Sequence, residues 1–112
     1  MPALEPVVCL VSAPPADAAR IAAALVEREL AACVNVLPGA RSIYRWQGEI
    51  HADEEALLVL KSTRAALAGI DRALQEIHPY DTFELVALEV TAGSEPYLEW
   101  LTASVAPQPS SR

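Results

Sequence analysis

Four side chains in this sequence have the chemistry to bind a soft or borderline metal ion: the thiols of Cys9 and Cys33 and the imidazoles of His51 and His78. The Cys33 thiolate would suit a soft metal, although a cysteine among alanine and valine residues is more often simply buried. His78 could be a ligand through its neutral ring, or a cation at a helix C-terminus. His51 stands beside the acidic residues 53–55 and is expected on a solvated face. Because no pair has Cys-x-x-Cys or His-x-x-x-His spacing, spacing alone predicts no strong metal site.

Catalysis is disfavoured by the same residue types. A cysteine nucleophile with His78 as its base is conceivable, but a cysteine in the middle of an apolar strand remains a protonated thiol. The four glycines are scattered, so the sequence has no phosphate-binding loop and no dinucleotide fingerprint. We therefore expect a protein that is not an enzyme.

Aromatic side chains mark a second group of candidates. Tyr44 and Trp46 lie on one face of a strand by two-residue parity, with Arg45 on the other face. They are expected to anchor a subunit contact, and the alternative is that they stack on a ligand. Tyr97 and Trp100 are one helical turn apart and are expected to be core or packing residues rather than a binding site.

Two charged residues stand next to apolar strands. Lys61 and Glu84 flank strand ends where a cleft between protomers could form, or they could pair as ions. Glu29 falls near the centre of an apolar helix face and could be an acid buried at an interface.

Composition limits the classes of function. The chain has 112 residues and 53% hydrophobic residues, which predicts one globular domain over residues 1–112. Fifteen acidic residues oppose eight basic ones, and the net charge of −7 disfavours nucleic acid as a partner. Two cysteines are too few for a disulfide scaffold, and no apolar run is long enough to span or target a membrane. We expect a cytoplasmic protein with reduced thiols.

The elements that position these residues follow from hydrophobic periodicity. Apolar runs predict strands at 7–11 and 56–60, and a longer strand at 34–46 is expected to bend or bulge at Pro38-Gly39. A helix is expected over 15–30, and another, capped by Ser62 or Thr63, ends before Pro79 so that His78 leaves helical geometry. A fourth strand at 85–90 and a helix capped by Ser94 follow, with a flexible tail at 107–112.

This order predicts an α+β, ferredoxin-like βαββαβ sandwich with an additional C-terminal helix. Right-handed crossovers place both long helices on one face of an antiparallel sheet. The strands at 7–11 and 56–60 are apolar on both faces, however, and the short third helix would cover only part of the second face. Because exposed valine and leucine side chains cost about 1.5 to 3 kcal/mol each, the pattern predicts obligate self-association.

Six segments in order resemble the CutA divalent-cation tolerance family, over about residues 5–105. The segments are Ser12-Ala13-Pro14, Leu30-Ala31-Ala32-Cys33-Val34-Asn35 with Pro38-Gly39, Ser42-Ile43-Tyr44-Arg45-Trp46-Gln47-Gly48-Glu49-Ile50, Leu60-Lys61-Ser62-Thr63, His78-Pro79-Tyr80 and Tyr97-Leu98-Glu99-Trp100-Leu101. The resemblance implies a trimer in which long bent hairpins extend into neighbouring subunits. The residues expected at an intersubunit cleft or interface are Tyr44, Trp46, Lys61, Tyr80, Glu84 and Trp100.

The resemblance implies a copper site, which this sequence matches only in part. Some members bind copper through a first-strand cysteine and a histidine pair before Pro-Tyr. Here Val11 occupies the cysteine position, with Cys9 two residues earlier, and Ile77 replaces the first histidine. The candidate metal residues are therefore His78, Cys33 and Cys9, for Cu(II), Cu(I) or another divalent cation. Phe83 replaces a proline of the family, so the loop after Tyr80 is expected to be looser.

Two functions remain open from the sequence. One is a metal-binding protein of metal response and homeostasis, with ligands that meet at a subunit boundary. The other is a trimeric module like the PII signalling proteins, which binds a small effector or a partner protein without metal. Both share one fold, so architecture does not separate them.

Overall fold

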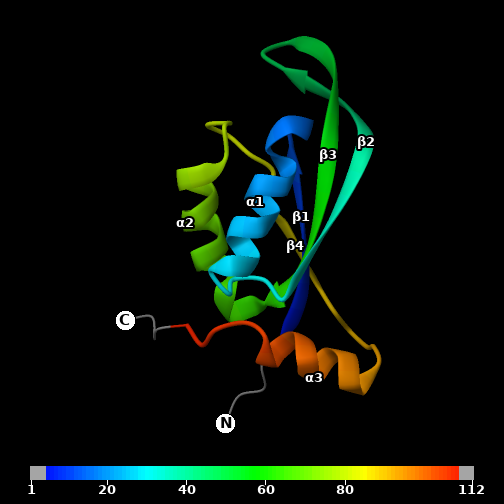
Figure 1. The fold of residues 1–112 in the computed structure, drawn as a ribbon. Coiled ribbons are helices and arrows are strands. Elements are labelled where there is room, and N and C mark those ends of the chain that lie inside the picture. Colours follow the sequence, from blue (N-terminus) through cyan, green and yellow to red (C-terminus); the bar gives the residue numbers. More distant parts are fainter. Residues whose placement is uncertain (1–4, 109–112) are drawn as a thin grey trace.

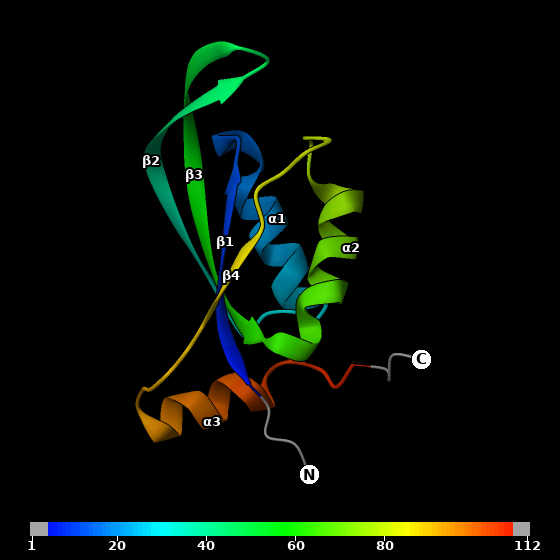
Figure 2. The same ribbon diagram turned by 180° about the vertical axis from the view of Figure 1, so that it is seen from behind.

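The computed structural model describes residues 5–108 of the chain, and its four strands form one antiparallel sheet in the order β2-β3-β1-β4. The elements are β1 (Pro6–Ala13), α1 (Pro15–Glu27), β2 (Cys33–Trp46), β3 (Glu49–Thr63), the 3-10 turn η1 (Arg64–Ala66), α2 (Leu67–Ile77), β4 (Val86–Glu89) and α3 (Glu95–Ala103). Figure 1 shows α1 and α2 side by side on one face of the sheet and α3 across its end, and Figure 2 gives the reverse view. The predicted α+β fold is confirmed.

The hydrophobic core lies between the sheet and the two long helices. Alternate residues of β1 are buried, and β3 places Leu58 and Leu60 on the same side, fully buried. From the helices, Ile21 and Leu25 of α1 and Ile70 of α2 are also fully buried. The period of two in the strands thus meets the apolar stripes of two helices, which cover the centre of this face, while Val36 and Ala87 at its edges stay exposed.

The opposite face of the sheet, here called the open face, is also apolar. Its side chains in the centre of the sheet are half-buried, and those at the edges are exposed; they are Val8, Leu10, Leu57 and Val59 in the first group and Leu37, Val86 and Leu88 in the second. The register confirms that they share a face, since Leu10 lies opposite Val59 in β3 and Val86 in β4. The sequence-based prediction that two strands are apolar on both faces therefore holds within the chain.

The β2–β3 hairpin bends because β2 contains a bulge. Leu37 pairs with Leu57, but Ala40 pairs with Glu55, so β2 has one residue more than its partner between these pairs. Gly39 adopts a φ of 79°, which an L side chain rarely adopts. The hairpin turns at Gly48, also with positive φ, and its tip extends beyond the end of β1 and curves sideways (Figure 1). The predicted bend at Pro38-Gly39 is confirmed.

The end of α1 differs from the prediction. The helix ends at Glu27 instead of near Leu30, and Glu29 takes the left-handed conformation with a φ of 58°. Glu29 is exposed in the chain, so the helix projection that placed it on an apolar face is wrong: the helical period had already stopped.

The predicted helix caps are also wrong in detail. The Ser62 hydroxyl donates to the Leu30 carbonyl at 2.6 Å, and Thr63 and Ser94 occupy N-cap positions without a side-chain hydrogen bond to the helix. The chain enters α2 through the 3-10 turn, which replaces a side-chain cap. His78 is extended, with φ −80° and ψ 137°, as the following proline predicts.

Residues 109–112 lie outside the described residues, and with them most of the tail expected at 107–112. None of the helices between residues 5 and 108 combines the length and the hydropathy that a bilayer crossing requires.

Candidate functional site

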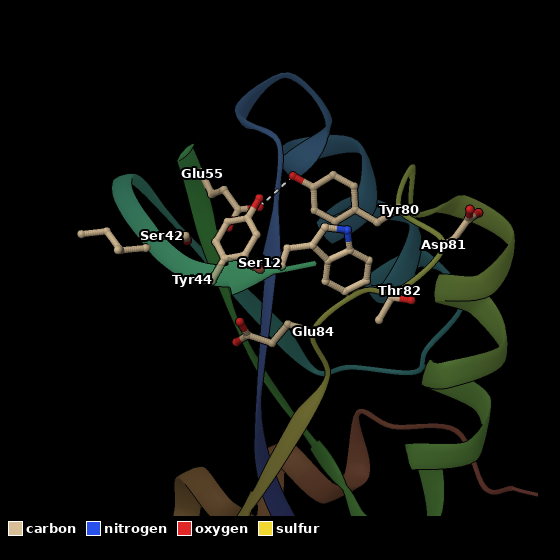
Figure 3. Close-up of a pocket in the computed structure, with 10 residues that line it drawn as sticks. Ser12, Ser42, Tyr44, Glu55, Tyr80, Asp81, Thr82 and Glu84 are labelled. Atoms are coloured by element: carbon tan, nitrogen blue, oxygen red, sulfur yellow. Dashed lines mark hydrogen bonds between the residues drawn. The ribbon is translucent and has the colours of Figure 1, made fainter. Parts of the chain in front are cut away.

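A pocket of about 640 Å³ lies where the bent hairpin faces the loop between α2 and β4. Its walls come from the hairpin and from that loop, and β1 contributes one residue; the lining residues are Ser12, Ser42, Ile43, Tyr44, Trp46, Glu55, Tyr80, Asp81, Thr82 and Glu84. Figure 3 shows Tyr44 and Glu55 from the hairpin opposite Tyr80 from the loop. Three segments that are distant in sequence thus form one cavity, here called the hairpin pocket.

The bulge in β2 decides which side chains reach this pocket. Before the bulge, Cys33 and Leu37 point to the open face; after it, the parity is reversed and Tyr44 and Trp46 occupy that same face. The hairpin pocket is therefore the upper continuation of the open face, with aromatic and polar residues in place of valine and leucine.

Glu55 and Tyr80 form the central contact of the pocket. The Tyr80 hydroxyl donates to Oε2 of Glu55 at 2.8 Å, and Glu55 is only 6% exposed (Figure 3). Partial burial, and then the hydrogen bond to this carboxylate, raise the pKa of Tyr80 to about 12. At neutral pH the phenol therefore keeps its proton and stabilises the carboxylate.

His78 lies next to the pocket and holds the loop against β1. The backbone N–H of Tyr80 donates to Nδ1 of His78 at 3.1 Å, and Nε2 lies 2.8 Å from the carbonyl oxygen of Ser12. Because Nδ1 accepts, the ring proton is on Nε2, which donates to Ser12, and the imidazole is neutral. The ring also stacks on Phe83, with centroids 5.3 Å apart. Both ring nitrogens are used, so a metal ion at His78 would have to displace one of these hydrogen bonds.

The two cysteines lie on opposite faces of the sheet. Cys9 is fully buried in the core, and burial raises the pKa of its thiol to about 11, so it remains protonated at neutral pH. Cys33 is half-buried on the open face, in register with Lys61. Within one chain the structure does not bring Cys9, Cys33 and His78 together. No group of three or more histidine, cysteine or acidic side chains suited to a metal ion occurs among residues 5–108.

The charged candidates are separated rather than paired. Lys61 donates a hydrogen bond to Oδ1 of Asn35 on the open face, whereas Glu84 lines the hairpin pocket. The part of the chain that the structure describes contains no ion pair between Lys61 and Glu84.

The aromatic pair of α3 is not part of the core. Tyr97 and Trp100 are 42% and 48% exposed, and their ring centroids are 5.5 Å apart. They are therefore not core residues, although the two rings lie against each other, because α3 lies across the end of the sheet and turns only Leu101 fully inward.

Sequence reasoning missed Glu55 and the role of His51. Glu55 was grouped with an acidic, solvated stretch, but its parity with Leu57 places it on the same face as the pocket. His51 is half-buried and stacks on Tyr44, with ring centroids 5.4 Å apart. Counting one extra residue at Pro38-Gly39 would have placed Glu55 with the aromatic residues.

Comparisons with known proteins agree with this fold. Residues 7–104 match the family model described as CutA1 divalent ion tolerance protein. The chain is similar to the divalent-cation tolerance protein CutA of Thermus thermophilus, with 48% identity over 95 residues, covering 84% of this chain and 92% of that protein. For the protein of the same name from Pectobacterium atrosepticum the identity is 44%, covering 93% and 96% of the two chains.

The fold of the chain is also similar to that of solved structures. The divalent cation tolerance protein of Thermus thermophilus superposes with a TM-score of 0.87 at 45% identity, covering 90% of this chain and 99% of that one. A structure described as PII-like protein CutA from Nostoc superposes with a TM-score of 0.84 at 32% identity, covering 89% and 97%.

Proposed function

Because this chain belongs to the CutA1 divalent ion tolerance family, we propose that it binds copper or another divalent metal ion and contributes to metal tolerance as a homotrimer. The observation that carries the proposal is the open face, whose apolar side chains are only partly covered and at whose β2 edge the Cys33 thiol lies beside Asn35 and Lys61. Covering this face by copies of the chain removes valine and leucine side chains from water. It also brings Cys33 next to groups of another subunit.

The ligands of such a site come from more than one subunit, because one chain does not gather them. Cys33 is the accessible thiol, and a thiolate suits Cu(I) best. His78 would be a second ligand only after giving up its bond to Ser12 or to Tyr80. Cys9 would have to leave the core, so it is the weakest member of the predicted set.

Titration calorimetry with Cu(I), Cu(II) and Zn(II) tests this proposal, together with light scattering of the same samples. We expect a particle of three times the 12.0 kDa chain mass and saturable metal binding that is lost in Cys33→Ala and weakened in His78→Ala. Cys9→Ala is the matched control, since it removes the same group from the other face of the sheet. Metal binding that is unchanged in both Cys33→Ala and His78→Ala would overturn the metal site.

A second function is favoured by a separate observation, the hairpin pocket. A cavity of about 640 Å³ with aromatic walls and several polar groups is of the size that binds small molecules. We propose as the alternative a trimeric module that binds a small effector, and the likeness to a protein described as PII-like supports it. A thermal-shift screen of small metabolites tests it, because a ligand of the native state raises the melting temperature. A screen without any shift contradicts it.

The proposal also includes a binding role rather than catalysis, and a cytoplasmic location. The protonated thiol of Cys9 and the fully hydrogen-bonded ring of His78 support the absence of a cysteine–histidine nucleophile. Two separate, unpaired thiols suit a reducing compartment. Localisation of a tagged chain in its own cell, with an assay for cysteine hydrolase activity, tests both statements.

A further inference from the structure

We propose that the hairpin pocket binds a small organic cation of the quaternary ammonium type. This inference rests on the effector-binding alternative of the proposed function and names the chemical class of the effector. It depends on three features of the described residues: a buried carboxylate without a cationic partner, aromatic walls, and a lining that carries acidic groups but no basic ones.

The buried carboxylate belongs to Glu55. Its side chain is almost fully buried, yet the Tyr80 hydroxyl is its only hydrogen-bond donor among residues 5–108, and no lysine, arginine or histidine there pairs with it. A buried negative charge is costly unless a cation or several donors compensate for it. The Tyr80 hydroxyl is one neutral donor, so most of the compensation for the negative charge of Glu55 has to come from a ligand.

The second oxygen of Glu55 is open to the pocket. Only Oε2 accepts a hydrogen bond, but no sealed side-chain oxygen or nitrogen lacks a partner in the described part of the chain. Oε1 therefore keeps some accessible surface, and Glu55 lines the hairpin pocket. The negative charge is thus presented to whatever enters the cavity.

The walls of the pocket suit an organic cation. Tyr44, Trp46 and Tyr80 line it and are 41%, 50% and 37% exposed. Tyr44 stacks on His51 and Tyr80 lies against His78, so each of these two rings packs within the chain on one side and keeps part of its surface open. Aromatic rings attract cations placed over their faces, and quaternary ammonium groups are commonly bound by several rings together. Glu84 and Asp81 at the same cavity add negative potential.

Other classes of ligand fit this lining less well. A hard metal ion needs several oxygen ligands around it, and no metal-binding group of three acidic, cysteine or histidine side chains exists among residues 5–108. An anion would meet Glu55, Asp81 and Glu84 without a basic side chain in the lining. A neutral ligand would leave the buried charge of Glu55 uncompensated.

The test compares choline with 3,3-dimethyl-1-butanol, which has the same shape without the charge. The Trp100→Phe variant leaves Trp46 as the only tryptophan of the two in the chain, so its fluorescence reports on the pocket. We expect choline to change this fluorescence saturably and to release heat in calorimetry at millimolar concentrations. The neutral alcohol is expected to bind at least about tenfold more weakly, the factor that one desolvated cation contact of this kind supplies.

A matched pair of variants locates the site. Glu55→Gln removes the charge but keeps the shape, and we expect it to weaken choline binding about tenfold. Glu54→Gln is the control, because it makes the same change in net charge on the opposite face of β3. Tyr80→Phe provides a second pocket variant in case Glu55→Gln does not fold, and circular dichroism checks the fold of each.

The outcomes separate this inference from the effector proposal. Equal binding of choline and the alcohol, or equal weakening by Glu55→Gln and Glu54→Gln, would overturn the cation specificity while leaving an effector pocket in place. Binding of neither compound, together with a metabolite screen without shifts, would overturn both. Displacement of choline by Zn(II) that is lost in Glu55→Gln would also contradict the organic-cation inference, because the pocket would then bind a metal ion.

Discussion

Leu58 and Leu60 of β3 are fully buried under α1 and α2, whereas Leu57 and Val59 of the same strand keep part of their surface in water. The two faces of β3 thus carry similar apolar side chains, but helices cover only one of them. The chain's own helices α1 and α2 cover the centre of the helix face, whereas no helix covers the centre of the open face in the described part of the chain (Figures 1 and 2). The difference shows that one side of the sheet is covered within the chain, whereas the apolar side chains of the other side are only partly covered by it.

The largest expected effect is on the helix face. Leu58→Ala leaves a cavity in the core and should reduce the free energy of unfolding by about 2 to 5 kcal/mol, independently of protein concentration. Chemical denaturation at two protein concentrations measures it. The neighbouring Leu57→Ala is the control: its smaller loss, measured against wild type at the same concentration, should shrink upon dilution, because it acts through association and disappears when the subunits separate. Equal, concentration-independent losses would remove the distinction between the faces.

The next effect concerns assembly. Val59→Lys puts a charge in the centre of the open face and should dissociate the oligomer, since it removes about 2 kcal/mol of apolar burial in each subunit and adds like charges. Light scattering should then give the mass of a smaller particle. Ala68→Lys, on the exposed side of α2, adds the same charge elsewhere and should leave the mass unchanged. A wild-type particle of one chain would contradict the assembly proposal outright.

A smaller effect belongs to the pocket at the upper end of the open face. Tyr80→Phe removes the hydrogen bond to Glu55 and should cost about 1 kcal/mol at neutral pH. Because the folded-state pKa of Tyr80 is raised from 10 to about 12, its contribution is complete below pH 10 and is lost as the pH rises toward 12. Unfolding curves of the two proteins should therefore converge over this range. A constant difference would show that the phenol does not titrate as the geometry indicates.

The smallest effect is a difference in reactivity between the two thiols. In the Cys33→Ser variant only Cys9 remains, and its burial and raised pKa predict no reaction with a thiol reagent in the native state. Reaction should begin only when the chain unfolds. In Cys9→Ser the remaining thiol on the open face should react while the protein is folded, more slowly when subunits cover it. Fast native labelling of Cys9 would contradict the closed core.

Much of the fold could be predicted from local patterns. The apolar runs at 7–11 and 56–60 predicted two central strands, Pro79 predicted where α2 ends, and Pro38-Gly39 predicted the bend in the hairpin. The wrong predictions concern residues whose positions are decided by tertiary contacts rather than by local sequence patterns. Ser62 donates to Leu30 instead of capping a helix, and Trp100 is exposed because α3 lies across the end of the sheet.

The pocket could not be predicted, because it depends on one residue of register. Tyr44 and Trp46 were correctly placed on one face of their strand, but the bulge decides that this is the open face and that Glu55 lies beside them. A one-residue shift exchanges the two faces of a strand, and Pro38-Gly39 predicted a bend or bulge but not the number of residues that it inserts.

The amino-acid sequence by itself determined which segments are strands and helices, and that the central strands are apolar on both sides, because periodicity and backbone propensity are local properties. Only the tertiary structure decided which candidates meet. It separated Cys9 from Cys33 across the sheet, used both nitrogens of His78 to hold a loop, and placed Tyr80 on Glu55. These outcomes depend on register and on long-range hydrogen bonds, which connect residues that local patterns treat separately.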